Sequence, residues 1–295
     1  MTDAVGRPGF CPKWLELRER ADAAARAPEL LRPLRDRLAA APAPERFGGT
    51  DGLVIRDLGC GTAAMGRWLA VRLPGPQHWV LQDHDPVLLV QAAHRMPSSA
   101  ADGRPVTAVT AYADLAGLTA AELAGTSLVT ASALLDLLTR DALESVAAAC
   151  TGAGCPALLT LSVTGRVELT PADPLDAAVS AAFNAHQRRT EGGRRLLGPD
   201  AVAAATEAFV RRGARVVTRP SPWRLGGPES ALTERWLRGW VGAAREQRPE
   251  LAAEAEGYLR RRLEACAAGE LTVAVHHTDL LALPGPSLPG AFVAA

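Results

Sequence analysis

The stretch from Leu53 to Ala63 (LVIRDLGCGTA) limits the possible folds of this 295-residue chain more than any other part of the sequence. An apolar run leads to Asp57, two glycines follow, and a helix-forming segment begins at Ala64. This order predicts a buried strand, a tight turn and the first turn of a helix. Gly59 and Gly61 allow the backbone to turn sharply and a ligand to approach it closely. An ordinary strand-to-helix turn and a nicotinamide site would show the same pattern.

A second acidic residue stands where a second strand is expected to end. The run from His78 to Asp83 predicts a strand, and Asp83 lies 26 positions after Asp57. In dinucleotide-binding folds an acidic side chain about 20 residues after the glycine turn accepts hydrogen bonds from the ribose. Asp83 is therefore a candidate for ribose binding, with a solvated strand end as the alternative. Pro86 predicts the start of the next helix.

Together these features resemble motif I of the class I S-adenosylmethionine (SAM) dependent methyltransferases, acidic-x-Gly-x-Gly-x-Gly. Asp57, Gly59 and Gly61 match, and Ala63 replaces the last glycine. We expect this departure to be mild, because the third glycine mainly allows close helix packing. The resemblance implies that SAM is the cofactor and S-adenosylhomocysteine (SAH) the product.

Later segments extend the resemblance. Asp114 and Leu115 follow the predicted strand 106–112 and are similar to motif III, which implies a bond to the adenine amino group; a turn cap is the alternative. Residues 126–139 resemble the stretch that passes beneath the sulfonium, and Asp136 there either faces the substrate or caps the next helix. The cofactor-binding residues implied in this way are Asp57, Gly59, Cys60, Gly61, Asp83, His84, Asp114, Leu115 and Ala131.

Two other regions are candidates for contact with the methyl acceptor. The pattern of residues 14–40 predicts helices that are divided near Pro28 and Pro33. These helices either close over the substrate or only pack against the rest of the domain. Trp14 and Arg18 lie one helical turn apart and are expected to line the substrate site together with Ser132.

A polar, arginine-rich insertion is expected from Thr164 to Gly198, after a fifth strand over 156–163. Its helix carries candidate substrate ligands, and a solvated helix face is the alternative reading. These ligands are Asn184, Gln187 and Arg188. His186 and Asp136 are the candidate general bases, and imidazole has a suitable ordinary pKa of about 6.5.

The resemblance implies an α/β fold with a seven-stranded Rossmann-like sheet, six strands parallel and the last antiparallel, with helical cap and lid insertions. We expect a helical cap at 1–45, a SAM-binding half at 46–163, a lid at 164–198, a C-terminal half at 199–285 with a helical insertion at 228–268, and a tail at 286–295. We expect the helical insertion to serve as a lid element, as a homodimer face or only as a packing element.

The composition limits the kinds of partner that this protein is expected to bind. Lys+Arg and Asp+Glu both number 32, so the balanced charge argues against nucleic-acid binding. The five scattered cysteines have no zinc spacing, and we expect no metal. No apolar run is long enough for a membrane, and Met1–Phe10 lacks a signal-peptide pattern, so we expect a cytoplasmic protein without membrane partners.

The sequence thus predicts methyl transfer from SAM to a small polar metabolite, planar or anionic, in secondary metabolism. It is similar to a group of actinobacterial small-molecule methyltransferases. An rRNA or protein methyltransferase and a non-catalytic SAM-binding protein are the alternative functions.

Overall fold

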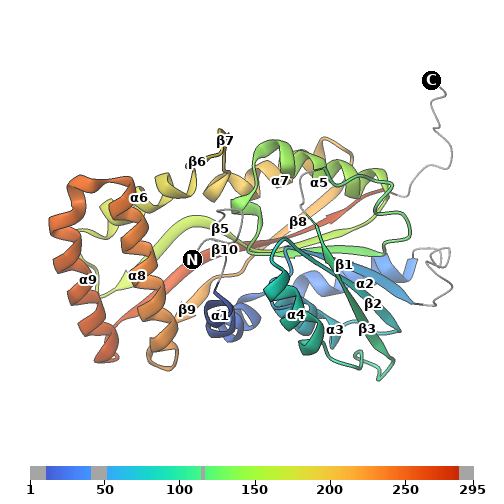
Figure 1. Cartoon of the computed structure of the whole chain (residues 1–295), viewed down its shortest axis with the longest axis horizontal. Helices are drawn as coiled ribbons and strands as arrows, with labels where there is room; N and C mark the ends of the chain where they lie inside the picture. Colours follow the sequence, from blue (N-terminus) through green and yellow to red (C-terminus); the bar gives the residue numbers. More distant parts are fainter. Residues whose placement is uncertain (1–10, 41–51, 114–116, 286–295) are drawn as a thin grey trace.

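A mixed β-sheet forms the centre of the computed structural model, which describes residues 11–40, 52–113 and 117–285 (Figure 1). Within these residues the sheet has eight strands; seven follow the order β3-β2-β1-β4-β5-β10-β8, and β9 pairs with β10. The strands are β1 Leu53–Leu58, β2 Gln77–Asp83, β3 Val106–Tyr112, β4 Leu128–Ser132, β5 Ala157–Thr170, β8 Arg215–Pro220, β9 Trp223–Leu225 and β10 Thr272–Leu283. Strand β10 runs antiparallel between β5 and β8, which confirms the predicted fold class.

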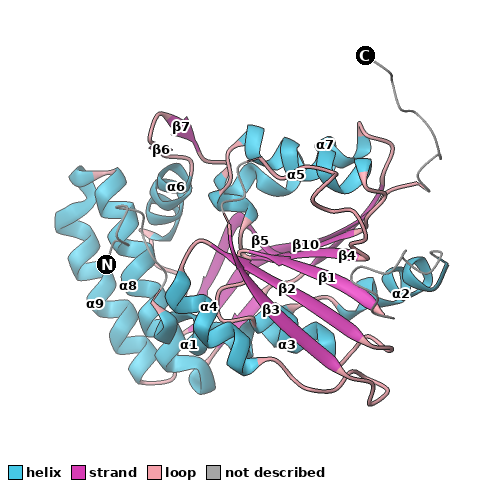
Figure 2. Cartoon of the chain, turned by 45° about the vertical axis from the view of Figure 1, so that its right-hand side comes forward, coloured by secondary structure: helices cyan, strands magenta, loops and turns pink. Residues whose placement is uncertain are grey.

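Helices cover both faces of the sheet (Figure 2). They are α1 Pro12–Ala25, α2 Leu31–Ala40, α3 Ala64–Ala70, α4 Pro86–Arg95, α5 Arg140–Gly152, α6 Asp176–Gln187, α7 Ala201–Val210, α8 Ser230–Gln247 and α9 Ala252–Ala267. A two-stranded hairpin, β6 Thr190–Glu191 with β7 Arg194–Arg195, follows α6. In the described part of the chain, no helix is both long and apolar enough to cross a membrane.

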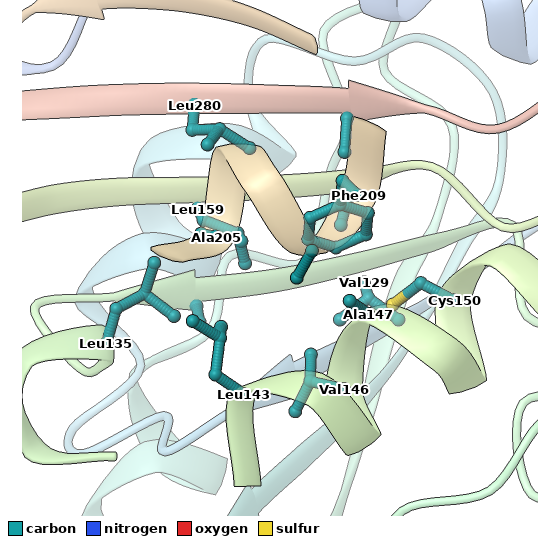
Figure 3. Packing of buried hydrophobic residues seen from close by; sticks show 14 of the residues in the cluster. Val129, Leu135, Leu143, Val146, Ala147, Cys150, Leu159, Ala205, Phe209 and Leu280 are labelled. Carbon is teal, nitrogen blue, oxygen red and sulfur yellow. The ribbon is translucent and has the colours of Figure 1, made fainter. Parts of the chain in front are cut away.

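Alternating side chains of the central strands fill two separate cores. Val129 and Leu159 pack with α5 and α7 on one face (Figure 3), whereas Leu128 and Leu158 pack with α2 and α3 on the other. Successive residues of a strand point to opposite faces, so each strand supplies both cores. The parallel strands therefore consist largely of apolar residues, as the sequence suggested.

Strand β5 continues well beyond the rest of the sheet. The prediction that this strand ends at Val163 is wrong, because it stays paired with β10 as far as Thr170. From Val163 onward, exposed and less exposed positions alternate, as in a strand with one solvated face. We call this extension, residues 163–170 of β5 with 272–277 of β10 and strand β9, the arm.

The arm carries a third core, built with α6, α8 and α9. Trp236 stacks on Trp240 with ring centroids 5.0 Å apart, and Tyr258 packs against Trp240. The Tyr258 hydroxyl donates to Asp176 Oδ1 (2.6 Å), which also accepts from Arg262 (2.5 Å) and so fastens α9 to α6. Both predicted helices of the 228–268 insertion are present, and they pack on this core.

Asp279 connects four segments of the chain at the carboxyl edge of the parallel strands. Its Oδ2 accepts from the Ala27 amide (2.8 Å), just after α1. Its Oδ1 accepts from the Leu161 amide in β5 (2.8 Å) and from the Ser221 hydroxyl between β8 and β9 (2.5 Å). Leu161 has a left-handed φ of 57°, so this hydrogen bond holds a bend within β5. Burial raises the pKa of Asp279, and these three donors oppose the shift.

We expect Asp279→Ala to lower the free energy of unfolding by roughly 3–5 kcal/mol, since each buried donor left without an acceptor costs about 1–3 kcal/mol. Asp200→Ala is the matched control, because Asp200 pairs with Arg188 at the surface; exposed pairs contribute about 0–1 kcal/mol. Urea unfolding of both variants would measure the difference. Equal losses in the two variants would show that Asp279 does not organise this edge.

Candidate functional site

The carboxyl ends of β1, β2 and β4 bring acidic and hydroxyl side chains to one edge of the sheet. Asp57 lies near the end of β1, Asp83 ends β2 and Ser132 ends β4. Ligands bind at this edge in open α/β sheets. The glycine loop, residues 59–63, joins β1 to α3 at the same edge.

The glycine loop turns through three left-handed residues. Gly59, Gly61 and Ala63 have φ values of 60°, 54° and 62°. From the sequence we expected Ala63 to affect mainly helix packing, but its left-handed φ makes the backbone conformation demanding as well. An alanine in this region costs roughly 1–2 kcal/mol, whereas glycine adopts it freely.

Several amides of the glycine loop are already bonded to the protein. The Cys60 amide donates to the Gln82 carbonyl (2.9 Å), and the Ala63 amide donates to the Cys60 carbonyl (2.8 Å). The Gly61 amide donates to Asp83 Oδ2 (2.8 Å). Loops that cradle phosphate point such amides at the ligand. This loop is instead hydrogen-bonded to β2, which argues against a site for a nicotinamide dinucleotide.

Asp57 is a buried carboxyl with one free oxygen. Oδ1 accepts from the Thr130 hydroxyl (2.7 Å), while Oδ2 has no hydrogen-bond partner among the described residues. Burial raises the pKa of Asp57 to about 7; the Thr130 hydroxyl and the Arg26 guanidinium oppose this shift, and Asp83 adds to it. A cationic ligand group at Oδ2 would favour the ionised form.

The other residues expected to bind the cofactor lie around this loop or outside the described structure. Asp83 is buried, and its Oδ1 accepts from the Asp85 amide (3.0 Å) and lies 3.4 Å from His84 Nδ1. Each carboxylate oxygen has a second lone pair for ribose hydroxyls. Cys60 is buried within the loop, and Ala131 is buried next to the last residue of β4. Asp114 and Leu115 lie outside the described residues, so their predicted adenine contacts stay predictions.

Helix α1 packs directly on the glycine loop. A Cβ atom on Gly61 would lie 3.2 Å from Leu15 Cδ1. Glu19 forms an ion pair with Arg67 of α3 (2.6 Å), which holds α1 against that helix. Just after α1, Arg26 extends toward β4, and its Nη2 donates to the Ser132 hydroxyl (3.0 Å). Arg26 is not among the site residues expected from the sequence, because its local pattern does not separate it from the arginines of α1.

The predicted pair Trp14 and Arg18 belongs to a larger buried group. The Arg18 guanidinium lies 5.9 Å from the Trp14 ring centroid and 4.9 Å from that of Trp223. Asp22 accepts from Arg18 Nε (2.9 Å) and from Trp223 Nε1 (2.9 Å). His277 lies against Trp223, with ring centroids 5.3 Å apart, and burial lowers its pKa to about 4. The imidazole is therefore neutral at physiological pH.

Asp136 lies four residues beyond Ser132, in the short 3₁₀ turn 135–137. It does not cap the next helix, because Thr139 is the N-cap of α5 and its hydroxyl oxygen accepts from the Ala142 amide (3.2 Å). This excludes the helix cap, one of the two roles that the sequence left open for Asp136; the other is to face the substrate. Burial raises the pKa of Asp136, while the guanidinium charges of Arg18 and Arg189 oppose the shift.

Most polar residues of α6 bond to their own neighbourhood. His186 Nε2 lies 3.2 Å from Glu246 Oε2 on α8. Asn184 donates to the Gly165 carbonyl (2.8 Å), and Arg188 holds Asp200 through two 2.7 Å bonds. Gln187 is different, since its buried Oε1 has no partner in the described part of the chain. Of these four residues, Gln187 keeps the clearest free group for a ligand.

Two surface hollows lie away from this edge. One, of about 420 Å³, is lined by residues of α8 and α9 that include Arg238 and Leu263. The other, of about 410 Å³, lies beside Glu246 and Pro249. Across residues 11–40, 52–113 and 117–285, no three His, Cys, Asp or Glu side chains form a group that could hold a metal ion.

Comparison with known proteins gave matches among solved structures. No protein-family model matches the sequence, and no curated protein matches it. A SAM-dependent methyltransferase from Geobacter sulfurreducens, in complex with SAH, is 16% identical over 93% of this chain and 99% of that chain, with a TM-score of 0.45. The cyclopropane synthase MmaA2 from Mycobacterium tuberculosis is 14% identical over 90% and 98% of the chains, with a TM-score of 0.38. The function proposed below therefore rests on the residues of this chain.

The raised pKa of Asp57 predicts a pH-dependent stability. The folded pKa of about 7 lies above the ordinary value of 3.8, so the folded state binds more protons between these values. Stability from this group is therefore present below about pH 4 and lost as the pH rises to 7. In thermal unfolding without ligand, we expect Asp57→Asn to gain stability relative to the wild type between pH 5 and 8, by on the order of 2–4 kcal/mol. A constant difference across this range would contradict the assignment.

Proposed function

We propose that this protein is a SAM-dependent methyltransferase that acts on a small polar metabolite, planar or anionic. The observation that carries the proposal is the edge formed by Asp57, Asp83 and the glycine loop. Two carboxyls stand at the ends of adjacent strands, and the loop between them is bonded to β2 instead of being open to phosphate. Such an edge suits a nucleoside whose other end is cationic, as SAM is.

The orphaned polar atoms fit the different parts of SAM. The remaining lone pairs of Asp83 would accept from the two ribose hydroxyls. The free Oδ2 of Asp57 would face the ammonium group of the methionine part. Ala131 and Ser132, at the end of β4, would lie beside the sulfonium. When bound, SAM supplies a methyl group that is already electrophilic, so the chain mainly has to align the acceptor and exclude water.

The aromatic and charged group beside α1 supports a planar or anionic acceptor. Trp14 and Trp223 present flat apolar surfaces, and Arg18 lies between them. Indole rings bind planar groups by stacking, and a guanidinium favours an anion nearby. Asp136 follows β4 in the 3₁₀ turn 135–137, four residues after Ser132, and so comes from the same edge of the sheet.

Asp136 is the better candidate for a general base. If the acceptor atom is a hydroxyl oxygen, the Asp136 carboxylate would take the hydroxyl proton as that oxygen receives the methyl group, and SAM would leave as SAH. His186 was the other candidate, but its Nε2 is directed to Glu246 of α8. We therefore assign proton removal to Asp136.

Incubation with SAM labelled in its methyl group tests the proposed function. The substrates are three separate pools from a bacterial extract: small molecules, RNA and protein. We expect label to enter the small-molecule pool. Label in RNA or protein would favour those methyltransferase classes instead. SAH binding in calorimetry without transfer to any pool would indicate a non-catalytic SAM-binding protein, and binding of NAD⁺ in place of SAH would overturn the proposal.

Paired variants test the base. With the small-molecule fraction that accepts label, we expect Asp136→Asn to lower kcat by roughly 10²–10⁴-fold, the usual contribution of a general base. His186→Ala is the matched control and should keep kcat within about threefold, because His186 contacts α8. Both variants should bind SAH as the wild type does in calorimetry. The reverse order of activities would assign the base to His186, and full activity in both would mean that the acceptor needs no base.

A further inference from the structure

Arg26 is a buried cation with unused hydrogen-bond donors. Its side chain lies at the end of α1, the residue is only 3% exposed, and Nη2 donates to the Ser132 hydroxyl. The guanidinium carbon lies 5.5 Å from the centroid of the Trp68 ring in α3. Nε and Nη1 are both buried and have no acceptor among the described residues. Arginine stays protonated in proteins, so this site holds a positive charge with free N–H groups.

The nearby carboxylates do not account for these donors. Asp22 bonds to Arg18 and Trp223, and Asp279 bonds to three other groups of the fold. Asp57 accepts from Thr130 through Oδ1. No carboxylate oxygen of the described residues forms a hydrogen bond or an ion pair with Arg26. A buried charge without a direct partner is costly, which points to a partner that the chain itself does not supply.

The glycine loop has few free amides to offer an anion, so an anion bound here would need a side chain as its partner. Amides of Cys60, Gly61 and Ala63 are already used within the protein. Arg26 lies near the start of this loop, because it bonds to Ser132, which follows Ala131, and Ala131 pairs with Leu58 just before Gly59. Beside it, Asp57 keeps a free oxygen. A free guanidinium edge and a free carboxylate oxygen together match the two charges of an α-amino acid.

We infer that Arg26 binds the α-carboxylate of the methionine part of the cofactor, through Nε and Nη1. This inference rests on the proposed function, because it takes SAM and SAH as the ligands of this edge. By this inference Arg26, at the end of α1, contacts the cofactor directly, in addition to any role of α1 in covering the acceptor. The Ser132 hydroxyl and the Trp68 ring then serve to fix the guanidinium in place.

Removing the carboxylate from the ligand gives the first test and needs no variant. Calorimetry on the wild-type protein compares SAH with its decarboxylated analogue, in which the amino acid part is a propylamine. Hydrogen bonds to charged groups are strong, so we expect SAH to bind about 10–100-fold more tightly. Equal affinity would overturn the role of Arg26 and leave the proposed function intact. Binding of neither ligand would overturn both.

Removing the guanidinium gives the second test. Arg26→Met should lower the affinity for SAH by about 10–100-fold and change that for the decarboxylated analogue by less than threefold. Arg72→Met is the matched control, because Arg72 also lies over the Trp68 ring, at 4.8 Å, but bonds to the Trp68 carbonyl; it should leave both affinities unchanged. Equal losses for both ligands in Arg26→Met would show a purely structural role. If Arg26→Met does not fold, Arg26→Lys, which keeps the charge, should bind SAH more weakly than the wild type while the analogue is unaffected.

Discussion

The candidate site depends on one buried carboxyl, Asp279, which holds together segments that are far apart in the sequence. Its two oxygens fix the end of α1, the bend in β5 and the turn before β9. Two of these segments carry residues of the candidate site, namely Arg26 next to Ala27 and Trp223 two residues after Ser221. Because the antiparallel strand β10 runs back between β5 and β8, a single residue on it can reach all three. The carboxyl edge of the sheet is thus organised by a strand that does not itself end there.

The buried ionisable side chains at this edge have only some of their polar atoms in hydrogen bonds. Asp57 keeps one free oxygen and Arg26 two free nitrogens, whereas both oxygens of Asp83 already accept from backbone amides and offer only their second lone pairs. Full mutual pairing of Asp57 and Arg26 would leave none of these atoms free for a ligand. Leaving a buried donor and a buried acceptor unpaired sacrifices stability at the place where the proposed cofactor supplies the complementary groups.

Local signals in the sequence, namely apolar runs, glycine turns and prolines at helix starts, predicted β1, β2, β3 and the start of β5. The antiparallel last strand followed from the family resemblance. The sequence did not predict the length of β5, since the alternation after Val163 is interrupted by Gly165 and resembles a polar insertion. Arg26 was missed for a different reason. Its role depends on burial and on contacts with Ser132 and Trp68, more than 40 residues away, which no local pattern reports. The expectation for His186 depended on the side of α6 that faces the sheet, and that side is set by the packing of α8. The roles assigned to the site residues remain predictions.

The length of the arm sets, in fixed steps, how far α6, α8 and α9 lie from the carboxyl edge of the parallel strands. In a strand, side chains repeat every two residues, a rise of about 6.6 Å. Inserting two residues in β5 and two in β10 would move α6, α8 and α9 outward by one such step and keep the same faces turned inward. Asp57, Asp83 and Arg26 lie outside the arm and would keep their places. The distance between these helices and the carboxyl edge would therefore change while the proposed cofactor contacts stay the same.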